Sequence, residues 1–295
     1  MVDAGLAGPE RESSVTASSL VAAISIVAIV AVLALLSLNR AHYTTRTLTS
    51  GSSWATYDRN SVLKVLTLNI HAGLDALGND RVDDIGQLIS DFGPDLVGLQ
   101  EVRRNDARTR RVLQDVTLSS HSGMIALFQP LVWLLGTTQG NAVLSRTYPE
   151  AENSLTLSGG RERRGILLVS VKLGDVEVDF INVHFGLSVS ERSTQIRALV
   201  DLLEQRGNPA IVAGDFNVEP DSVELQPLAA IAREAWDAAL VRHDSGMTFP
   251  ASNPRVRIDQ IWVYGPLEVL ETGVIRSDVS DHLPVYASIR LQPLL

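Results

Sequence analysis

The chain has 295 residues, a formal net charge of −9 and no cysteine. Without cysteine, a disulfide framework, a thiolate zinc site and a cysteine nucleophile are all excluded. The acidic balance argues against a protein that coats nucleic acid, because such proteins need a broad positive surface.

The first long element is an apolar segment at residues 20–38 that contains no charged side chain. Its 19 residues, at about 1.5 Å each, span about 28 Å, which is close to the hydrocarbon core of a bilayer. We therefore expect an uncleaved, single-pass transmembrane helix in the cell membrane, after an N-terminal tail at 1–19. A cleaved signal peptide is the alternative, but its first part should be basic, and here acidic residues outnumber the single Arg11.

The charges that flank this segment leave its orientation open. Arg40 and Arg46 follow it and Arg11 precedes it, which by the positive-inside rule would leave the C-terminal bulk in the cytoplasm. The bias is small, so an exported, membrane-tethered domain stays open as well. Residues 39–61 are rich in threonine and serine and are expected to form a flexible linker. One folded domain should follow at 62–295, and the whole net charge of −9 lies on it.

The expected domain begins with alternating strand and helix patterns. Residues 62–68 are typical of a buried strand. Apolar residues then recur at i, i+3, i+4 and i+7 between 85 and 92, which indicates a helix that ends at Gly93. A second buried strand is expected at 95–100.

The rest of the domain continues this alternation. Further strands are expected at 142–145, 166–171, 176–183, 210–213, 258–263, 269–275 and 285–291. Ser188 and Glu191 form a capping box at the start of another helix. Some strands are apolar throughout and others alternate, which predicts sheets packed together with helices outside, in a layered α/β (α+β) domain.

Polar side chains gather where these strands begin or end. They are Asn69, Glu101, Asn141, His184, Asp215, Asn217, Asp259, Asp281 and His282. One aspartate after a strand is usually a turn former or a helix cap, but so many such placements in one domain indicate a site at one edge of a sheet.

These residues lie in motifs that resemble the endonuclease/exonuclease/phosphatase superfamily. The motifs occur in the family's order at 67–70, 100–101, 140–146, 182–184, 214–217, 257–259 and 280–284. The resemblance covers roughly residues 62–292 and implies a four-layer α/β sandwich, with two central, mostly antiparallel sheets flanked by helices. It also implies hydrolysis of a phosphoester with a divalent cation, usually Mg²⁺, with Mn²⁺ or another divalent cation as alternatives. Hard oxygen ligands suit Mg²⁺.

The resemblance also implies roles for individual residues. Glu101 is the expected principal metal ligand, with Asn69 and Asp281 close to the cation. Asn141 and Arg164 are expected to bind the substrate.

The same resemblance implies the catalytic residues. Asp215 should orient or deprotonate the attacking water, and Asn217 should fix Asp215 or the phosphate. His282, oriented by Asp259, should act as general base or as electrostatic stabiliser. His184 should donate a hydrogen bond to a phosphate oxygen.

Two further features each have two interpretations. Arginines follow Glu101 at 103, 104, 108, 110 and 111. They are expected to form either a solvated helix face or a patch that binds an anionic substrate or lipid headgroups. The apolar run at 124–135 indicates buried packing first, and as the alternative a loop that dips into a membrane near the site.

The sequence thus favours a membrane-tethered phosphodiesterase or phosphatase that acts on a lipid headgroup or a small phosphate ester. A membrane-anchored or secreted nuclease is the first alternative, since nucleic acid is a less favoured substrate but is not excluded. A binding module that keeps the fold without catalysis is the second. The sequence does not indicate an oligomeric state.

Overall fold

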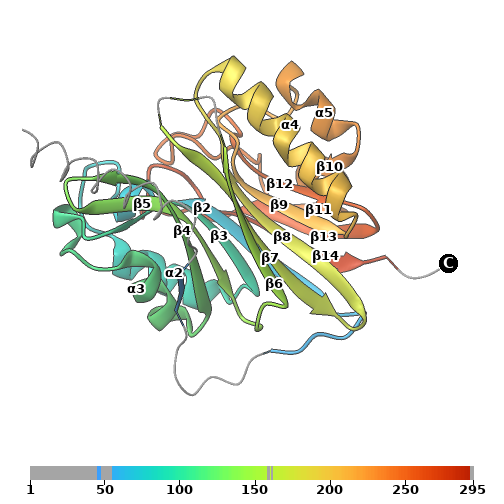
Figure 1. Ribbon diagram of the computed structural model, residues 1–295, viewed down its shortest axis with the longest axis horizontal. Coiled ribbons are helices and arrows are strands. Elements are labelled where there is room, and N and C mark those ends of the chain that lie inside the picture. Colours follow the sequence, from blue (N-terminus) through green and yellow to red (C-terminus); the bar gives the residue numbers. More distant parts are fainter. Residues whose placement is uncertain (1–44, 48–54, 158–159, 161, 293–295) are drawn as a thin grey trace, which may run out of the picture. The chain divides into compact units, whose positions relative to one another are not determined.

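The computed structural model describes residues 45–47, 55–157, 160 and 162–292 (Figure 1). The tail at 1–19 and the apolar segment at 20–38, where a transmembrane helix is expected, lie outside the described residues. Among the helices that the structure does describe, none is both long and apolar enough to cross a membrane.

Eight strands form the first sheet. In spatial order they are β1 (Thr45–Thr47), β4 (Ile125–Leu134), β5 (Thr137–Ser145), β3 (Leu96–Arg104), β2 (Val62–Asn69), β14 (Val285–Leu291), β13 (Leu267–Val274) and β11 (Val241–Arg242). The pairs β2–β3 and β11–β13 are parallel and the other neighbours are antiparallel.

Six strands form the second sheet. Their spatial order is β10 (Ala232–Glu234), β12 (Asp259–Tyr264), β9 (Ala210–Asp215), β8 (Val176–His184), β7 (Arg164–Leu173) and β6 (Ala151–Leu157). Only β8 and β9 are parallel in this sheet. Both sheets are therefore mixed, with mostly antiparallel pairs, as the sequence predicts.

The apolar core between the sheets explains why β2 is apolar on both faces. Leu63 and Val65 point to the second sheet and pack in one buried cluster with Leu167 and Val169 of β7. Alternate residues of a strand point to opposite faces, so the next pair along β2, Leu66 and Leu68, faces away from the second sheet.

Helices cover the outer faces of both sheets. Leu66 and Leu68 pack with residues of α2 (Val82–Phe92) and α3 (Gln114–Ser122). On the other side, α4 (Val189–Arg206) and α5 (Gln226–Ala229) lie over the second sheet (Figure 1). A short helix, α6 (Ala235–Ala238), follows β10. The order helix, sheet, sheet, helix is the expected four-layer α/β sandwich.

The longest helix begins at the capping box that the sequence predicts. The Ser188 hydroxyl accepts a hydrogen bond from the Glu191 N–H at 3.3 Å, and the Glu191 carboxylate accepts one from the Ser188 N–H at 3.2 Å. Such a cap contributes about 1 kcal/mol to helix stability. Gly207 ends α4 in the left-handed conformation that glycine adopts without strain.

Parts of the segment 39–61 belong to the folded domain, although a flexible linker is expected there. Strand β1 pairs with β4, with Thr45 opposite Phe128. Tyr57 forms a bridge with Leu173, and its hydroxyl donates to the Asp95 carboxylate at 2.7 Å. A row of threonines has high β-propensity, so polarity alone is a poor indicator of a linker here.

The apolar run at 124–135 forms the first strand, β4, and the first turn residue of a β-hairpin whose second strand is β5. Ile125 and Phe128 are buried in β4, as packing requires, but Leu134 and Leu135 at the turn are 68% and 97% exposed. The arginines after Glu101 do not form a helix face. Arg103 and Arg104 end β3, and Arg108 lies in a short 3₁₀ turn.

One polar side chain ties the two sheets together across the apolar layer. Asn182 of β8 donates through Nδ2 to the carbonyls of Leu99 in β3 and Ala142 in β5, at 2.9 and 2.8 Å. Its Oδ1 accepts from Gln100 Nε2 at 2.7 Å. These bonds hold β3 and β8, whose ends carry candidate site residues, at a fixed spacing.

Candidate active site

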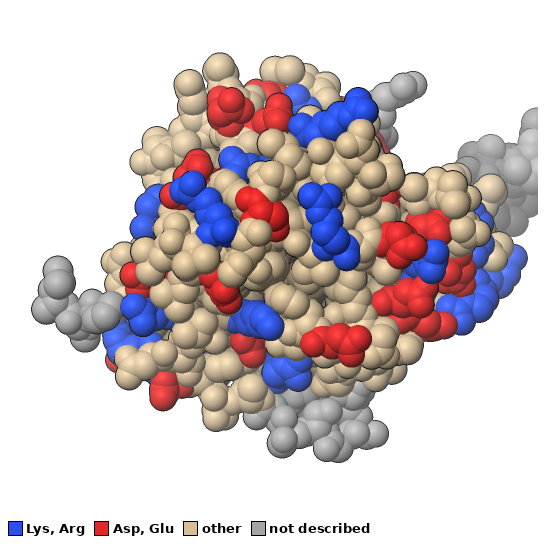
Figure 2. Space-filling view, turned by 180° about the vertical axis from the view of Figure 1, so that it is seen from behind, with Lys and Arg blue, Asp and Glu red and all other residues tan. Residues whose placement is uncertain are grey.

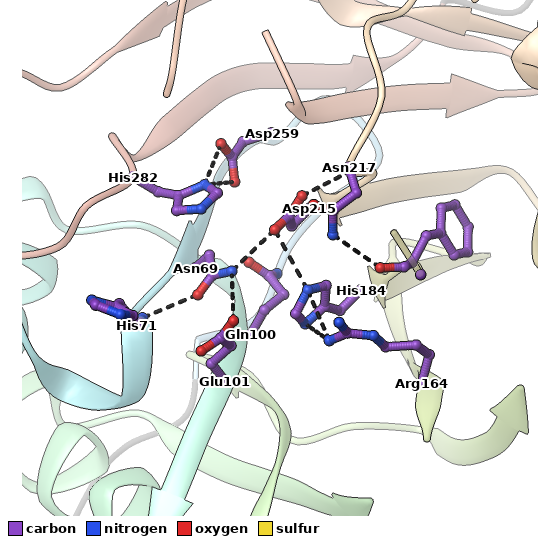
Figure 3. A network of polar contacts seen from close by, with 12 residues as sticks. Asn69, His71, Gln100, Glu101, Arg164, His184, Asp215, Asn217, Asp259 and His282 are labelled. Atoms are coloured by element: carbon purple, nitrogen blue, oxygen red, sulfur yellow. Dashed lines mark hydrogen bonds and ion pairs between the residues drawn. The ribbon is translucent and has the colours of Figure 1, made fainter. Parts of the chain in front are cut away.

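Five strands bring polar residues to one edge of the sandwich (Figure 3). Asn69 ends β2, His184 ends β8 and Asp215 ends β9. Strand β12 runs antiparallel to β9, so its first residue, Asp259, lies opposite Asp215. Glu101 reaches the same edge from β3. The strand directions therefore produce the convergence that the sequence predicts.

Glu101 is aimed at the site by an irregularity in β3. The pairing of β3 with β5 shifts between Leu99 and Val102, and Glu101 has a positive φ of 58°. A positive φ is uncommon for a residue with a side chain and costs of order 1–3 kcal/mol. A bulge of this kind turns a side chain that the regular pleat would send elsewhere, and here it directs the carboxylate toward Asn69.

The Asn69 amide lies between two carboxylates. Its Nδ2 donates to Asp215 Oδ2 at 3.0 Å and contacts Glu101 Oε1 at 3.4 Å. Its Oδ1 accepts from the His71 N–H at 3.0 Å, which fixes the amide. Asn69 thus connects the ends of β2, β3 and β9, which belong to different sheets.

Asp259 and His282 form a buried ion pair. His282 Nδ1 lies 2.9 Å from Asp259 Oδ2 and 3.1 Å from Oδ1. Burial alone would lower the pKa of His282, but the negative charges of Asp259, Asp215 and Asp281 raise it to about 10. The imidazole is therefore a cation at neutral pH.

Asp215 is fully buried beside this pair. Burial is the main cause that raises its pKa, the neighbouring Asp259 charge adds to it, and together they bring the pKa to about 6 although His282 lowers it. The Asn217 N–H donates to Asp215 Oδ1 at 2.9 Å. A carboxylate whose pKa lies close to neutrality can exchange a proton with water under physiological conditions.

His184 and Arg164 form the opposite wall. Burial and the nearby charges of Arg164 and His282 lower the pKa of His184 well below its ordinary value, so its ring is neutral. Arg164 Nη1 lies 3.0 Å from both ring nitrogens. Asn141 lines the same narrow cavity, and its Nδ2 donates to the Gly165 carbonyl at 2.9 Å.

Asp281 and Asn217 complete the edge. Asp281 is partly exposed, and its Oδ1 lies 3.6 Å from His71 Nδ1. Asn217 has a positive φ of 53° and donates through Nδ2 to the Phe185 carbonyl at 3.0 Å. This contact ties the segment after β9 to the segment after β8.

The structure brings every predicted site residue to this edge, and their roles stay predictions. The ten residues are Asn69, Glu101, Asn141, Arg164, His184, Asp215, Asn217, Asp259, Asp281 and His282. Asp75 and Asp80, which precede α2, pair with Arg81 and Arg110.

The sequence of the domain matches a known family over most of its length. The model of the Endonuclease/Exonuclease/phosphatase family matches residues 66–282. The chain belongs to this family. Members of this family are hydrolases of phosphoester bonds.

Individual relatives are more distant. A UPF0294 protein of Vibrio vulnificus (strain YJ016) is 30% identical over 120 residues, which is 39% of this chain and 39% of that protein. The chain thus matches only about two fifths of the length of this curated relative. A functionally unknown conserved protein from Enterococcus faecalis V583 has a similar structure, with a TM-score of 0.68 at 21% identity over 78% of this chain and 100% of that chain.

A third relative has a named activity. The mannosyl-6-phosphatase Bt3783 of Bacteroides thetaiotaomicron VPI-5482 superposes with a TM-score of 0.65 at 19% identity, over 77% of this chain and 99% of that chain. At this identity the likeness shows a shared family fold.

The donor set at the family site fits a hard divalent cation. Donor atoms of Asp215, Asp259 and His282 lie within 4.8 Å of one another. His282 is held as a cation and so makes a poor ligand, which leaves the carboxylates of Asp215 and Asp259 from this group, with the Glu101 carboxylate joined to Asp215 through the Asn69 amide. The negative charge of Asp259 adds to burial in raising the pKa of Asp215, so the two carboxylates repel one another. Oxygen donors with unbalanced negative charge are what Mg²⁺ and Mn²⁺ prefer.

The sequence patterns did not predict that three further residues belong to this site. The Phe249 ring packs on the His282 ring with 4.7 Å between centroids. The Thr248 hydroxyl accepts from the Asp259 N–H at 3.3 Å, and the Ser280 hydroxyl donates to the Asn69 carbonyl at 2.7 Å. Ser280 lies in a motif that the sequence does show, but Thr248 and Phe249 lie in a loop without any periodic pattern.

Proposed function

We propose that the protein is a divalent-metal-dependent phosphoester hydrolase that a membrane span at 20–38 tethers to the cell membrane. Its substrate class is a lipid headgroup or a small phosphate ester. The observation that carries the proposal is the pairing, at one sheet edge, of two carboxylates with a cationic histidine. Glu101 and Asp215 lie on either side of Asn69, and Asp259 holds His282 as a cation.

The metal would be held by Glu101, with Asn69 and Asp281 beside it. When bound there, Mg²⁺ neutralises charge on the phosphoryl oxygens and polarises the phosphorus for attack. Asn69 now turns its amide nitrogen to Glu101, so its oxygen would reach a cation only after the amide rotates. Glu101 is therefore the primary ligand of the proposal.

The residues around it divide the proton transfers between them. Asp215, fixed by the Asn217 N–H, accepts the proton of the attacking water. His282 carries a proton on each ring nitrogen, and its positive charge stabilises the negative charge on the phosphoryl oxygens in the pentacoordinate transition state. Of the two options that the sequence leaves open, this favours the electrostatic stabiliser over the general base. As a cation, His282 can also donate a proton to the leaving oxygen when the ester bond breaks.

His184 and Arg164 hold the phosphate from the other side. A neutral His184 donates one N–H, and Arg164 supplies a guanidinium that remains charged at every physiological pH. Oxygen atoms of a phosphoester are acceptors only, so donors from both walls orient the ester for in-line attack.

The surface charge supports a small ester over a nucleic acid. Figure 2, which shows the molecule from behind the view of Figure 1, has lysine and arginine interspersed with aspartate and glutamate, and the chain has a net charge of −9. A broad positive surface, which long nucleic acids require, is not formed on the face in view. The named activity of the Bacteroides relative, a mannosyl-6-phosphatase, points in the same direction.

A phosphoester panel tests the proposal. Sugar phosphates, phospholipids in vesicles and plasmid DNA are each offered to the full chain with Mg²⁺ and with EDTA. We expect EDTA-sensitive release from a lipid or small ester, and a loss of at least about 10³-fold in Glu101→Gln and His282→Ala. Glu204→Gln, an exposed glutamate on α4, is the matched control and should keep full activity.

Three results would contradict the proposal. Cleavage of DNA alone would favour the nuclease. Activity that survives EDTA, or that survives in Glu101→Gln, would refute the metal-dependent mechanism. Inactivity on the whole panel together with no Mg²⁺ signal in calorimetry would leave a non-catalytic binding module.

A further inference from the structure

The turn between β4 and β5 exposes two large apolar side chains next to the site. Leu134 is 68% exposed and Leu135 is 97% exposed. An exposed leucine by itself is ordinary. This pair, however, lies at the mouth of a groove of about 560 Å³ whose lining includes Glu101, the proposed metal ligand.

Leu135 also occupies a backbone position that leucine disfavours. Its φ is 49° and that of the following Gly136 is 84°. Two positive φ values in a two-residue hairpin turn define the type that normally takes asparagine, aspartate or glycine. A residue that is costly both for its conformation and for its exposure indicates a function for the side chain.

Strand directions place this turn at the active-site edge. Strand β4 is antiparallel to β5, and β5 is antiparallel to β3, so β3 and β4 run the same way. The turn after β4 therefore projects beyond the end of β3, where Glu101 and Arg103 lie.

The groove beside the turn holds a cationic group of three side chains, next to the carboxylates of Glu101 and Glu162, which also line it. Arg103 and Arg108 both pair with the single carboxylate of Asp106, at 2.8 and 2.7 Å. Two guanidinium groups share one carboxylate, so the trio keeps a net positive charge. Positive charge beside apolar tips suits phosphate headgroups above an acyl layer.

Strand β1 runs away from the hairpin turn. Strand β1 is antiparallel to β4, with Thr45 opposite Phe128 and Thr47 opposite Ala126. The chain therefore enters β1 from the side of the hairpin turn. Six residues separate the apolar segment 20–38 from β1, and six residues reach at most about 21 Å. A membrane span at 20–38 would keep the turn near the bilayer.

We infer that the β4–β5 turn inserts Leu134 and Leu135 into the phospholipid bilayer, with Arg103 and Arg108 against its phosphates, and so faces the active site to the membrane. The occupant of this apolar surface is thus the lipid bilayer. The inference rests on the membrane tether of the proposed function and not on its hydrolytic chemistry.

Single cysteines test this directly, because the chain has no cysteine of its own. Leu135→Cys and Leu240→Cys are each labelled with an environment-sensitive fluorophore in the full chain. Leu240 is the matched control, since it is 68% exposed like Leu134 and its N–H donates to Val269, near the opposite end of the sheet. The probe is a vesicle of phosphatidylcholine and phosphatidylglycerol.

We expect vesicles to shift the emission of the label at 135 to the blue and to reduce its quenching by iodide about threefold or more, as for a side chain in the acyl boundary. The label at 240 should not change. A label at 135 that stays accessible in vesicles that carry the protein would overturn the inference. Shielding at 135 without vesicles would overturn it too, in favour of contact with another protein copy.

Leu135→Asn provides a second test, in which the melting temperature should rise or hold while the protection of the turn by vesicles should fall. Asparagine suits the positive φ of the turn, so the melting temperature should rise or hold. The protection from iodide of a label at Leu134→Cys should fall in the same background. A variant that loses both stability and protection would indicate a merely structural turn. Neither readout uses catalysis, so an inactive panel result would refute the proposed hydrolase and leave this inference standing.

Discussion

A buried carboxylate sets the charge of His282. Asp259 is only 1% exposed, and its two carboxylate oxygens face His282 Nδ1. The Thr248 hydroxyl accepts from the Asp259 N–H, and the Phe249 ring covers the imidazole. The pair is therefore held both in position and in its charged form, which bulk water would not do.

Replacing this carboxylate should slow catalysis without unfolding the protein. In Asp259→Asn the amide keeps the shape but removes the charge that favours the imidazolium. We expect kcat to fall by about 10²-fold or more, with KM nearly unchanged, because the lost interaction acts on the transition state. Steady-state kinetics on the substrate found by the panel measures both.

The control for this variant is Asp201→Asn on the exposed side of α4, which should keep the parent kcat. Circular dichroism verifies the fold of both proteins. A rise in KM at constant kcat would contradict the assignment and make Asp259 a substrate-binding residue.

At the level of secondary structure, Asn182 is one of the side chains that bond the two sheets together across the core. Asn182 is fully buried and connects β8 with β3 and β5. Gly98 makes room for it, since a Cβ at 98 would lie 3.0 Å from Asn182 Oδ1. A polar group at this depth is stable only because its partners satisfy it.

We expect Asn182→Ala to lower the free energy of unfolding by about 2–4 kcal/mol, since it leaves polar groups unpaired in the core and opens a small cavity. Urea denaturation followed by tryptophan fluorescence measures this as a lower midpoint at an unchanged slope. Asn153→Ala, at an exposed position on β6, should change the midpoint little. Equal midpoints for both variants would show that the bonds of Asn182 are replaced by water.

The sequence predicts the strands of the domain better than it predicts the turns. Apolar runs such as 62–68 and 210–213 identify strands because burial on both faces leaves few other choices. The β4–β5 turn escapes prediction because Leu135 replaces the asparagine or glycine that marks such turns. Strand β1 escapes because its threonines also suit a linker.

In the site, too, local sequence patterns predict some features and not others. Residues that follow strands, such as Asn69 and His184, can be located because strand ends meet at a sheet edge. The cationic state of His282, the bulge at Glu101 and the contact with Phe249 depend on distances between segments far apart in the chain. Local pattern carries no information on these distances.

At the scale of the whole molecule, we expect one acidic residue outside the site, Glu234, to change how stability depends on pH. Glu234 ends β10 and is 6% exposed. Burial is the main cause that raises its pKa from 4.5 to about 7, and the charge of Asp237 adds to this, whereas Arg257 opposes it. The folded protein thus keeps a proton on Glu234 that the unfolded chain releases at a lower pH.

The sign of the effect follows from this difference. Between pH 4.5 and 7 the unfolded state loses the proton first, and its free energy falls relative to that of the folded state, so the contribution of Glu234 to stability declines as pH rises. The full difference of about 2.5 pKa units corresponds to about 3 kcal/mol. Below pH 4.5 the acid is neutral in both states and has no such effect.

Glu234→Gln should remove this loss, because an amide has no proton to release. We expect the variant to gain up to about 3 kcal/mol relative to the parent protein between pH 4 and pH 8, measured by urea denaturation at a series of pH values. Glu204→Gln, exposed on α4, should run parallel to the parent at every pH. If Glu234→Gln also runs parallel, then Arg257, whose Nη1 lies 3.6 Å from the Glu234 carboxylate, keeps that carboxylate ionised in the folded protein.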